Sequence, residues 1–271
     1  MDQIVVITGA SSGIGLAAAE QFAARGDRVV LVGRNPDRLA EAVRRVAKAG
    51  DREPGHFRTD FEDLSQVRDL AARLTDGYPS IDILANNAGG MLAGYRVTKD
   101  GYEATIQSNH LAGFLLTNLL RDRLHGARVV TTSSRAHHDG RPDPGDFRSD
   151  PGLTHRYGAA KAANVLFAAE LARRWPDVTS VSFHPGVVRT NFGEGAAVRL
   201  FYRFAPFLVT PEKAGELLVW LGTAPASELV NGAYYVGRET KEPAPHAADP
   251  AVAARLWEAS ARAVGLTPAQ P

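Results

Sequence analysis

The sequence lacks cysteine altogether, and its 271 residues carry almost no excess of either charge, with 31 basic and 30 acidic residues. The absence of cysteine excludes disulfide bonds, thiolate metal sites and a cysteine nucleophile, and it fits the reducing conditions of a cytoplasmic protein. The mixed charges favour neither nucleic acid nor an anionic membrane as a partner. The apolar run near the N-terminus, residues 4–7, is far shorter than a membrane span of about 20 residues. We therefore expect a small molecule as the partner.

The chain does contain a regular alternation of short β-branched runs with longer helical patterns. Such alternation predicts βαβ units around a parallel sheet with helices on both faces. We expect an α/β fold, a Rossmann-type doubly wound sheet of about seven strands in the order 3-2-1-4-5-6-7. No linker or repeat divides the chain, which indicates a single domain over residues 1–271 with a C-terminal extension at 243–271. The expected strands are residues 4–8, 28–32, 56–59, 81–85, 127–132, 178–183 and 233–236, and the expected helices include 15–26, 64–74, 155–175 and 249–264.

A glycine-rich turn follows the first expected strand and leads directly into an alanine-rich helix. Glycine lets the backbone lie against a pyrophosphate, whose charge is met by unpaired N–H groups and the positive end of the helix dipole. The spacing is Gly-x-x-x-Gly-x-Gly rather than the commonest dinucleotide pattern, Gly-x-Gly-x-x-Gly. A turn without a ligand is the alternative, and methyltransferases could also use such a turn. The predicted phosphate-binding residues are Gly9, Ser11, Ser12, Gly13, Ile14 and Gly15.

The end of the second strand bears on which nicotinamide cofactor is bound. A carboxylate there would hold the ribose hydroxyls of NAD, whereas an arginine suits the extra phosphate of NADP. The strand ends at Arg34, while Asp37 falls in the first turn of the next helix, where an acid is expected for dipole reasons alone. We therefore favour NADP(H) over NAD(H), with an ordinary surface arginine as the alternative. Asp60, after the third strand, is expected either to accept from the adenine amino group or to cap the following helix.

Tyr157 and Lys161 are four residues apart in a segment of helical composition, so they share one helical face. An ammonium group next to a phenol favours the phenolate, so the pair suits proton transfer, although it could also be an amphipathic surface pair. Ser134 follows the fifth strand, where its hydroxyl could hold a reacting oxygen. Asn109 lies inside a helical stretch, where asparagine is a poor helix former and invites a non-local explanation.

Taken together, these motifs resemble the single-domain branch of the short-chain dehydrogenase/reductase superfamily. The resemblance rests on TGASSGIG (8–15), NNAG (86–89), Asn109, Ser134, YGAAK (157–161) and HPGVVRT (184–190). Within that superfamily, SNHLAGFLLTNLL, VVTTSSRAHH and KAANVLFAAELARR are similar to the retinol-dehydrogenase-like group. The resemblance implies an oxidoreductase that interconverts an alcohol and a ketone or aldehyde on an apolar small molecule, using a nicotinamide cofactor.

The resemblance also implies a role for each matching residue. Tyr157 would be the general acid or base, Lys161 the neighbour that stabilises its phenolate and binds the ribose, and Ser134 the donor to the substrate oxygen. Asn109 would hold a water molecule in a proton relay behind the lysine, and Ser133 would be structural. The further cofactor-binding residues implied are Asn87, Ala88 and Gly89 beside the ribose, and Pro185, Gly186, Val188 and Thr190 beside the nicotinamide.

Two features leave alternatives open, and a third has one interpretation. Residues 186–210 include many aromatic side chains and could form a lid over an apolar substrate, or equally pack on the protein itself or at the subunit contact of a homo-oligomer. His137, His138 and Asp139 could contact substrate or a metal, but adjacent histidines in a Gly/Pro-rich loop are more often solvated, so no metal is expected. His184 is expected to be structural.

Two other functions use the same fold: a non-catalytic cofactor-sensing or scaffold protein, and a sugar-nucleotide epimerase or dehydratase. No catalytic position departs from the family pattern, which favours an enzyme over a sensor. Only a short segment follows the last expected strand, whereas epimerases usually need a sizeable C-terminal substrate region.

Overall fold

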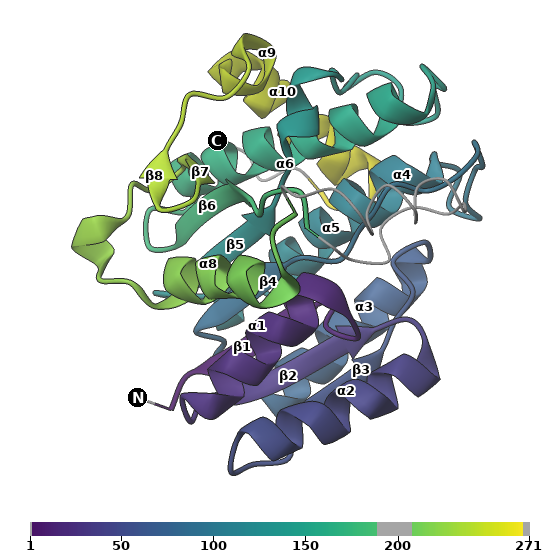
Figure 1. The fold of residues 1–271 in the computed structure, drawn as a ribbon. Helices are drawn as coiled ribbons and strands as arrows, with labels where there is room; N and C mark the ends of the chain where they lie inside the picture. The colour runs from purple at the N-terminus through teal and green to yellow at the C-terminus, as the bar shows by residue number, and fades with distance from the viewer. Residues whose placement is uncertain (1, 189–207, 268–271) are drawn as a thin grey trace.

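The computed structural model describes residues 2–188 and 208–267, which fold around one twisted sheet (Figure 1). Its strand order is β3-β2-β1-β4-β5-β6-β7-β8, and all neighbouring pairs are parallel except β7 with β8. The predicted order of seven strands is confirmed, and the sheet carries one unexpected antiparallel edge strand, β8. The strands are β1 Ile4–Thr8, β2 Arg28–Gly33, β3 Gly55–Arg58, β4 Ile83–Asn86, β5 Arg128–Thr132, β6 Thr179–His184, β7 Tyr234–Val236 and β8 Glu239–Thr240.

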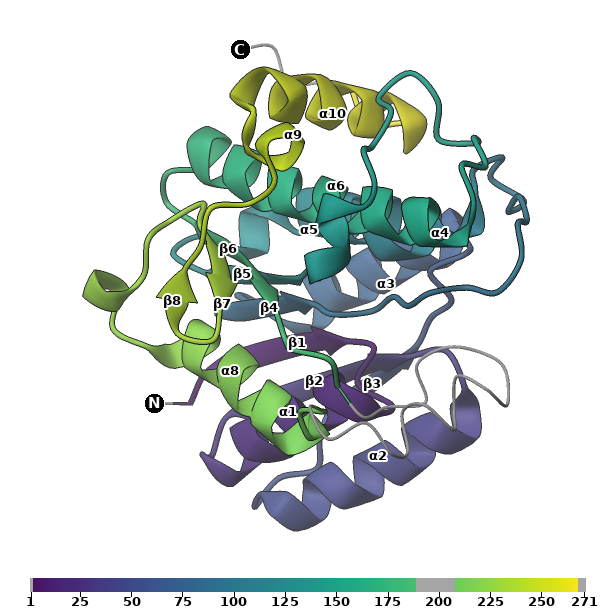
Figure 2. The same cartoon turned by 45° about the horizontal axis from the view of Figure 1, so that its top comes forward.

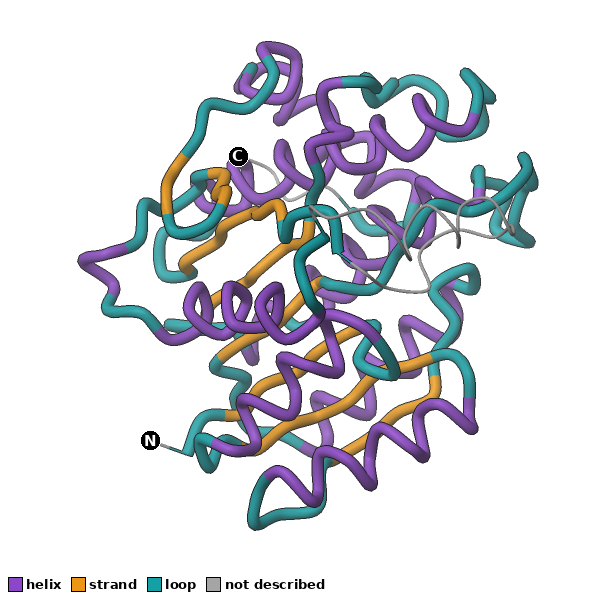
Figure 3. The backbone as a smooth tube through the Cα atoms, viewed as in Figure 1, coloured by secondary structure: helices purple, strands orange, loops and turns teal. Residues whose placement is uncertain are grey.

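Helices cover both faces of the sheet, with α1, α2 and α8 on one side and α3, α5 and α6 on the other (Figure 2). In Figure 3 the strands lie side by side through the middle of the molecule, between these two helical layers. None of the helices in residues 2–188 and 208–267 has the length and hydrophobicity needed to cross a membrane. The longer helices are α1 Gly13–Ala24, α2 Pro36–Ala49, α3 Leu64–Gly77, α5 Ala112–Leu119, α6 Leu153–Arg174, α8 Pro211–Thr223 and α10 Pro250–Ala263, and the short ones include α4 Ala104–Ile106 and α9 Pro245–Ala248.

The core lies in two layers, one on each face of the sheet, because successive side chains of a strand point to opposite faces. In β1, Val6 packs into the layer with α3, α5 and α6, while Val5 and Ile7 pack into the layer with α1, α2 and α8. All three are fully buried. Burial on both faces explains why the central strands are continuous apolar runs rather than alternating ones.

Side chains cap the starts of α2 and α3. Asn35 caps α2 by accepting from the Arg38 N–H at 2.9 Å, with Pro36 in the first turn. The cap of α3 is Asp63, whose carboxylate accepts from the Ser65 N–H at 3.0 Å. The alternative in which Asp60 caps this helix is therefore wrong.

The C-terminal extension docks on α6 through an aromatic cluster. The ring of Trp257 in α10 stacks on Phe167 of α6 and meets Phe114 of α5 edge-on, with centroids 5.8 and 4.9 Å apart. Such pairs add to the stabilisation from apolar burial. The extension is therefore packed against the helix that carries Tyr157 and Lys161.

Candidate active site

The glycine turn between β1 and α1 leaves no room for a side chain at Gly9 or Gly15. Gly9 has φ +68°, and a Cβ atom there would lie 2.9 Å from the Ala88 Cα atom. A Cβ atom at Gly15 would lie 2.5 Å from the carbonyl oxygen of Gly9. The start of α1 has no side-chain cap and no acidic residue in its first turn, so its positive end faces the turn unneutralised. These features fit a backbone cradle for a pyrophosphate.

Asn87, a predicted cofactor-binding residue directly after β4, is hydrogen-bonded to the ends of β1 and β5. Its backbone N–H and side-chain amide donate to Thr8, to the hydroxyl at 2.9 Å and to the carbonyl at 3.0 Å. Thr132, at the end of β5, donates to the Asn87 side-chain oxygen at 3.2 Å. Thr8 also accepts from the Ala88 N–H at 2.9 Å, a role that sequence reasoning missed. The shared contacts hold the glycine turn against the end of β4.

Arg34 and Asp60 come together at the ends of β2 and β3, as expected of neighbours at one sheet edge. The Arg34 side chain is 59% exposed and lies 2.8 Å from a Glu62 oxygen and 3.8 Å from an Asp60 oxygen. Glu62 also pairs with Arg96. Arg34 is thus exposed but not isolated, and its guanidinium remains accessible to an anion.

Tyr157 and Lys161 lie on the buried face of α6, so the alternative of an amphipathic surface pair is wrong. Tyr157 is 6% exposed and Lys161 3% exposed. The ammonium of Lys161 lies 5.4 Å from the centre of the Tyr157 ring and donates to the Thr132 carbonyl at 3.3 Å. Burial lowers the pKa of Lys161 to about 7 because the charged form is desolvated.

The two serines after β5 differ in burial and in hydrogen bonding. Ser133 is buried and donates to the Lys161 carbonyl at 2.8 Å, which ties the strand end to α6. Ser134 is half-buried, and its hydroxyl oxygen accepts from the Ala136 N–H at 3.2 Å. Because this bond uses only a lone pair, the hydroxyl hydrogen remains able to donate to a bound oxygen.

Asn109 lies in a π-helical turn, Gln107–Leu111, rather than in a regular helix. Its side-chain amide bonds both backbone groups of Gly90, each at 3.0 Å, and fixes the segment that follows β4. Its backbone carbonyl accepts from the Asn164 side chain at 3.1 Å, and Asn164 also donates to the Thr132 carbonyl at 3.0 Å. Sequence reasoning missed Asn164, whose only signal is an amide among the apolar residues of α6.

The segment after β6 is described only at its two ends. Val188 forms an isolated bridge with Val209, and the Val209 N–H donates to the Val187 carbonyl at 2.9 Å. Pro185 and Gly186 connect this bridge to β6 at the same edge as Ser134. Thr190 and most of the expected lid lie outside the described residues. The two ends of the segment therefore meet beside the candidate site.

The histidine pair after Ser134 divides into an exposed and a buried member. His138 and Asp139 are exposed, as expected, but His137 is fully buried and hydrogen-bonded, so the solvated interpretation is wrong for it. His184 is buried, which lowers its pKa to about 4 and keeps the ring neutral, in agreement with a structural residue. Within residues 2–188 and 208–267 no group of histidine and carboxylate side chains is arranged to hold a metal ion.

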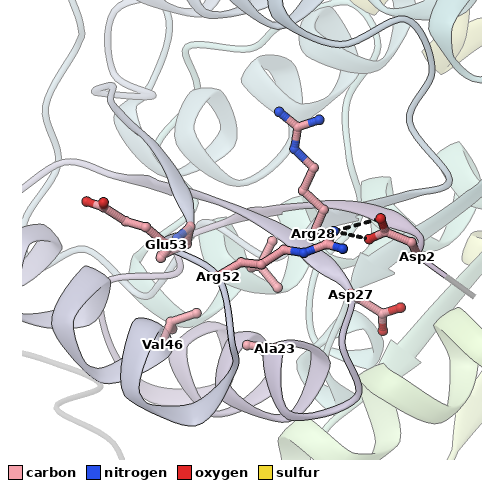
Figure 4. Close-up of a pocket in the computed structure, with 9 residues that line it drawn as sticks. Asp2, Ala23, Asp27, Arg28, Val46, Arg52 and Glu53 are labelled. Atoms are coloured by element: carbon pink, nitrogen blue, oxygen red, sulfur yellow. Dashed lines mark hydrogen bonds and ion pairs between the residues drawn. The ribbon is translucent and has the colours of Figure 1, made fainter.

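A separate pocket of about 250 Å³ lies at the amino ends of the strands, near the start of β2 (Figure 4). It is lined largely by charged side chains, and Arg52 pairs there with Asp2 at 2.6 Å. None of the predicted site residues lines it, and parallel α/β sheets bind ligands at the carboxyl ends of their strands. We therefore place the candidate site at the carboxyl ends of the strands, beside the glycine turn, Ser134 and Tyr157.

Comparison with known proteins identifies the family of the chain. A model of the short chain dehydrogenase family matches residues 3–197, and the chain belongs to this family. It is 52% identical over 269 residues to a proposed daunorubicin C-13 ketoreductase of Streptomyces sp. (strain C5), covering 97% of this chain and 93% of that protein. It is 36% identical over 284 residues to human retinol dehydrogenase 13, covering 97% of this chain and 84% of the human protein.

Two crystal structures show the same fold. A protein of Mycobacterium paratuberculosis without assigned function matches with a TM-score of 0.80 and 32% identity, over 97% of this chain and 94% of that one. A Shigella flexneri short chain dehydrogenase, crystallised with NADP, matches with a TM-score of 0.68 and 27% identity, over 86% and 95%.

Proposed function

We propose that the protein is an NADP(H)-preferring oxidoreductase that interconverts an alcohol and a ketone or aldehyde on an apolar small molecule, with Tyr157 as general acid or base. The observation that carries the proposal is the buried Tyr157–Lys161 pair, which lies next to the Ser134 loop at the sheet edge with the glycine turn. A surface pair would be screened by water, whereas in a buried site the same groups interact strongly.

In the direction of reduction, the hydroxyls of Ser134 and Tyr157 donate to the carbonyl oxygen of the substrate. A nicotinamide cofactor held by the glycine turn, Asn87 and Lys161 would supply the hydride for the carbonyl carbon. Tyr157 then transfers its proton to the developing alkoxide, and the adjacent ammonium of Lys161 stabilises the resulting phenolate. Oxidation follows the same steps in reverse. The protein residues contribute position and electrostatic stabilisation.

The names of the relatives support alcohol–carbonyl chemistry. One is named as a ketoreductase of daunorubicin, a ketone, and others as dehydrogenases of retinol, a largely apolar alcohol. A panel of apolar ketones, aldehydes and alcohols that includes daunorubicin and retinol, assayed with each cofactor by nicotinamide absorbance, tests the proposal. Turnover of at least one member is expected. Cofactor binding without turnover of any member would instead favour the cofactor-sensing alternative.

The preference for NADP(H) is proposed to depend on Arg34. Its exposed guanidinium, at the end of β2, would pair with the additional phosphate, and a charge-assisted hydrogen bond contributes about 1.5–3 kcal/mol. We expect Arg34→Ala to raise KM for NADPH by about 10- to 100-fold and to leave KM for NADH nearly unchanged.

Initial rates with both cofactors measure this effect. Arg44→Ala is a matched control, because Arg44 is an exposed arginine that pairs with Glu41 of its own helix, α2. A wild-type enzyme that prefers NADH, or an Arg34→Ala variant with unchanged KM for NADPH, would contradict the assignment.

A further inference from the structure

The C-terminal extension reaches the back of the loop that carries Ser134. His137 lies in the short 3₁₀ turn Arg135–His138, directly after Ser134, and its side chain is fully buried. The imidazole Nδ1 atom lies 2.7 Å from the Ser134 carbonyl oxygen, and the Nε2 atom lies 3.1 Å from the Ala244 backbone nitrogen. One ring thus connects the serine loop with the residue before α9.

The partners of this ring determine where its proton lies. A backbone N–H can only donate, so Nε2 must be the unprotonated acceptor for Ala244. A carbonyl can only accept, so Nδ1 must carry the proton and donate to Ser134. The bridge therefore requires a neutral imidazole in the Nδ1–H tautomer. Burial also lowers the pKa of His137, in the direction that keeps the ring neutral.

A second imidazole strengthens the same connection from α9. The Nε2 atom of His246 lies 2.9 Å from the His137 carbonyl and 3.0 Å from the Gly140 carbonyl. Both partners are acceptors, so this nitrogen carries the proton. Residues 244–248 are thus joined to residues 134–140 by two histidine side chains.

The same loop lies directly against α6 beside Tyr157. A Cβ atom at Gly158 would lie 2.5 Å from the Ala136 carbonyl, and a Cβ atom at Gly140 would overlap the backbone of Ala159. The loop and the helix therefore touch backbone to backbone. A shift of the loop would change the position of Ser134 relative to Tyr157.

We propose that His137 is a positioning residue: it holds the Ser134 carbonyl from behind and couples the C-terminal segment 244–248 to the placement of the Ser134 hydroxyl. The effect on catalysis rests on the proposed function, whereas the bridge itself does not. The bridge makes the C-terminal extension part of the active-site framework. Protonation of His137 would place a second donor against the Ala244 N–H and break the bridge.

The surroundings of His137 disfavour such protonation. Its ring meets Tyr234 of β7 edge-on, with centroids 4.9 Å apart, and lies 4.1 Å from the His138 ring. The carboxylate of Asp139 acts in the opposite direction and favours the protonated form. The titratable and charged groups that face or act on this cluster are Arg135, His138, Asp139, His184, Tyr234 and His246.

Two substitutions separate the two bonds of the ring. Asparagine places its amide nitrogen near the Nδ1 position, so His137→Asn keeps a donor for Ser134 and loses the acceptor for Ala244. Glutamine reaches the Nε2 position, so His137→Gln keeps the acceptor and loses the donor to Ser134. We expect kcat to fall by about 10- to 100-fold in His137→Gln, and by less in His137→Asn, because small misplacements of catalytic groups cost up to about 100-fold.

KM for the cofactor should stay near the wild-type value in both variants. His138→Asn is the matched control, because His138 is exposed in the same turn, and it should retain the wild-type kcat. Wild-type kcat in His137→Gln would overturn the inference while leaving the proposed oxidoreductase function intact.

A measurement without turnover tests the bridge separately. Nitrogen-15 NMR of labelled imidazoles, with His137→Asn used for assignment, should show the neutral Nδ1–H tautomer for His137 at pH 7. An imidazolium or an Nε2–H tautomer would overturn the inference. Because this spectrum needs no substrate, it decides on the bridge even if no member of the substrate panel is turned over.

Discussion

Replacing Tyr157 by phenylalanine should lower kcat by about 10²- to 10⁴-fold, the range expected when a general acid or base is removed. The dissociation constant of the cofactor should remain close to the wild-type value. The reason is that the ring is buried in α6 and the substitution removes only its hydroxyl. Steady-state kinetics and a cofactor titration by fluorescence measure the two quantities independently.

Tyr95→Phe is the matched control for this experiment. Tyr95 is an exposed tyrosine whose hydroxyl donates to the Arg148 carbonyl at 2.8 Å, outside the proposed machinery. It should retain the wild-type kcat. If Tyr157→Phe also retained it, Tyr157 could not be the proton-transfer group, and the proposed chemistry would need another acid.

Replacing Lys161 by methionine should abolish most of the activity and stabilise the cofactor-free protein. The ammonium is buried and donates to the Thr132 carbonyl, and no carboxylate within residues 2–188 and 208–267 pairs with it, so its burial as a charge is unfavourable. Methionine has a similar length and no charge. The melting temperature should therefore rise, by roughly 2–4 °C for each kcal/mol gained in a domain of this size. Thermal unfolding of both proteins without cofactor measures the difference.

The pH dependence of this difference has a definite sign. The pKa of Lys161 is about 7 in the folded protein and 10.5 for an unperturbed lysine, so between these values the unfolded chain binds the proton and the folded chain does not. Titration of Lys161 therefore makes the free energy of unfolding of the wild-type protein rise with pH in this window. Wild type should gain stability relative to Lys161→Met between pH 7 and 10. Parallel stability curves for the two proteins would contradict the lowered pKa.

Much of the fold could be predicted because it depends on local patterns. Buried parallel strands require continuous β-branched runs, and such runs in β1 and β2 place Arg34 and the glycine turn at the same sheet edge. The spacing of Tyr157 and Lys161 likewise fixes a shared helical face. β8 was missed because it is a two-residue edge strand without a pattern of its own.

The supporting contacts of the site could not be predicted because they depend on tertiary structure. His137 and His138 are adjacent residues of the same type, and tertiary contacts such as those of His137 with Ala244 and Tyr234 distinguish the buried ring from the exposed one. Asn164 contacts the Asn109 carbonyl across a separation of 55 residues. Asp60 and Asp63 are both suitable helix caps by type, and the backbone path after β3 selects Asp63.

Deuterium transfer tests the proposed hydride chemistry most directly. NADPH labelled at either hydrogen of nicotinamide C4 would be incubated with the wild-type protein and the ketone or aldehyde that the panel selects, and the product analysed by mass spectrometry. We predict that one of the two labels appears on the carbinol carbon with wild type, and that Tyr157→Phe forms almost no product. Product without label from either cofactor, or tight binding of NADPH with no oxidation of it by any carbonyl compound, would contradict an oxidoreductase that works through Tyr157.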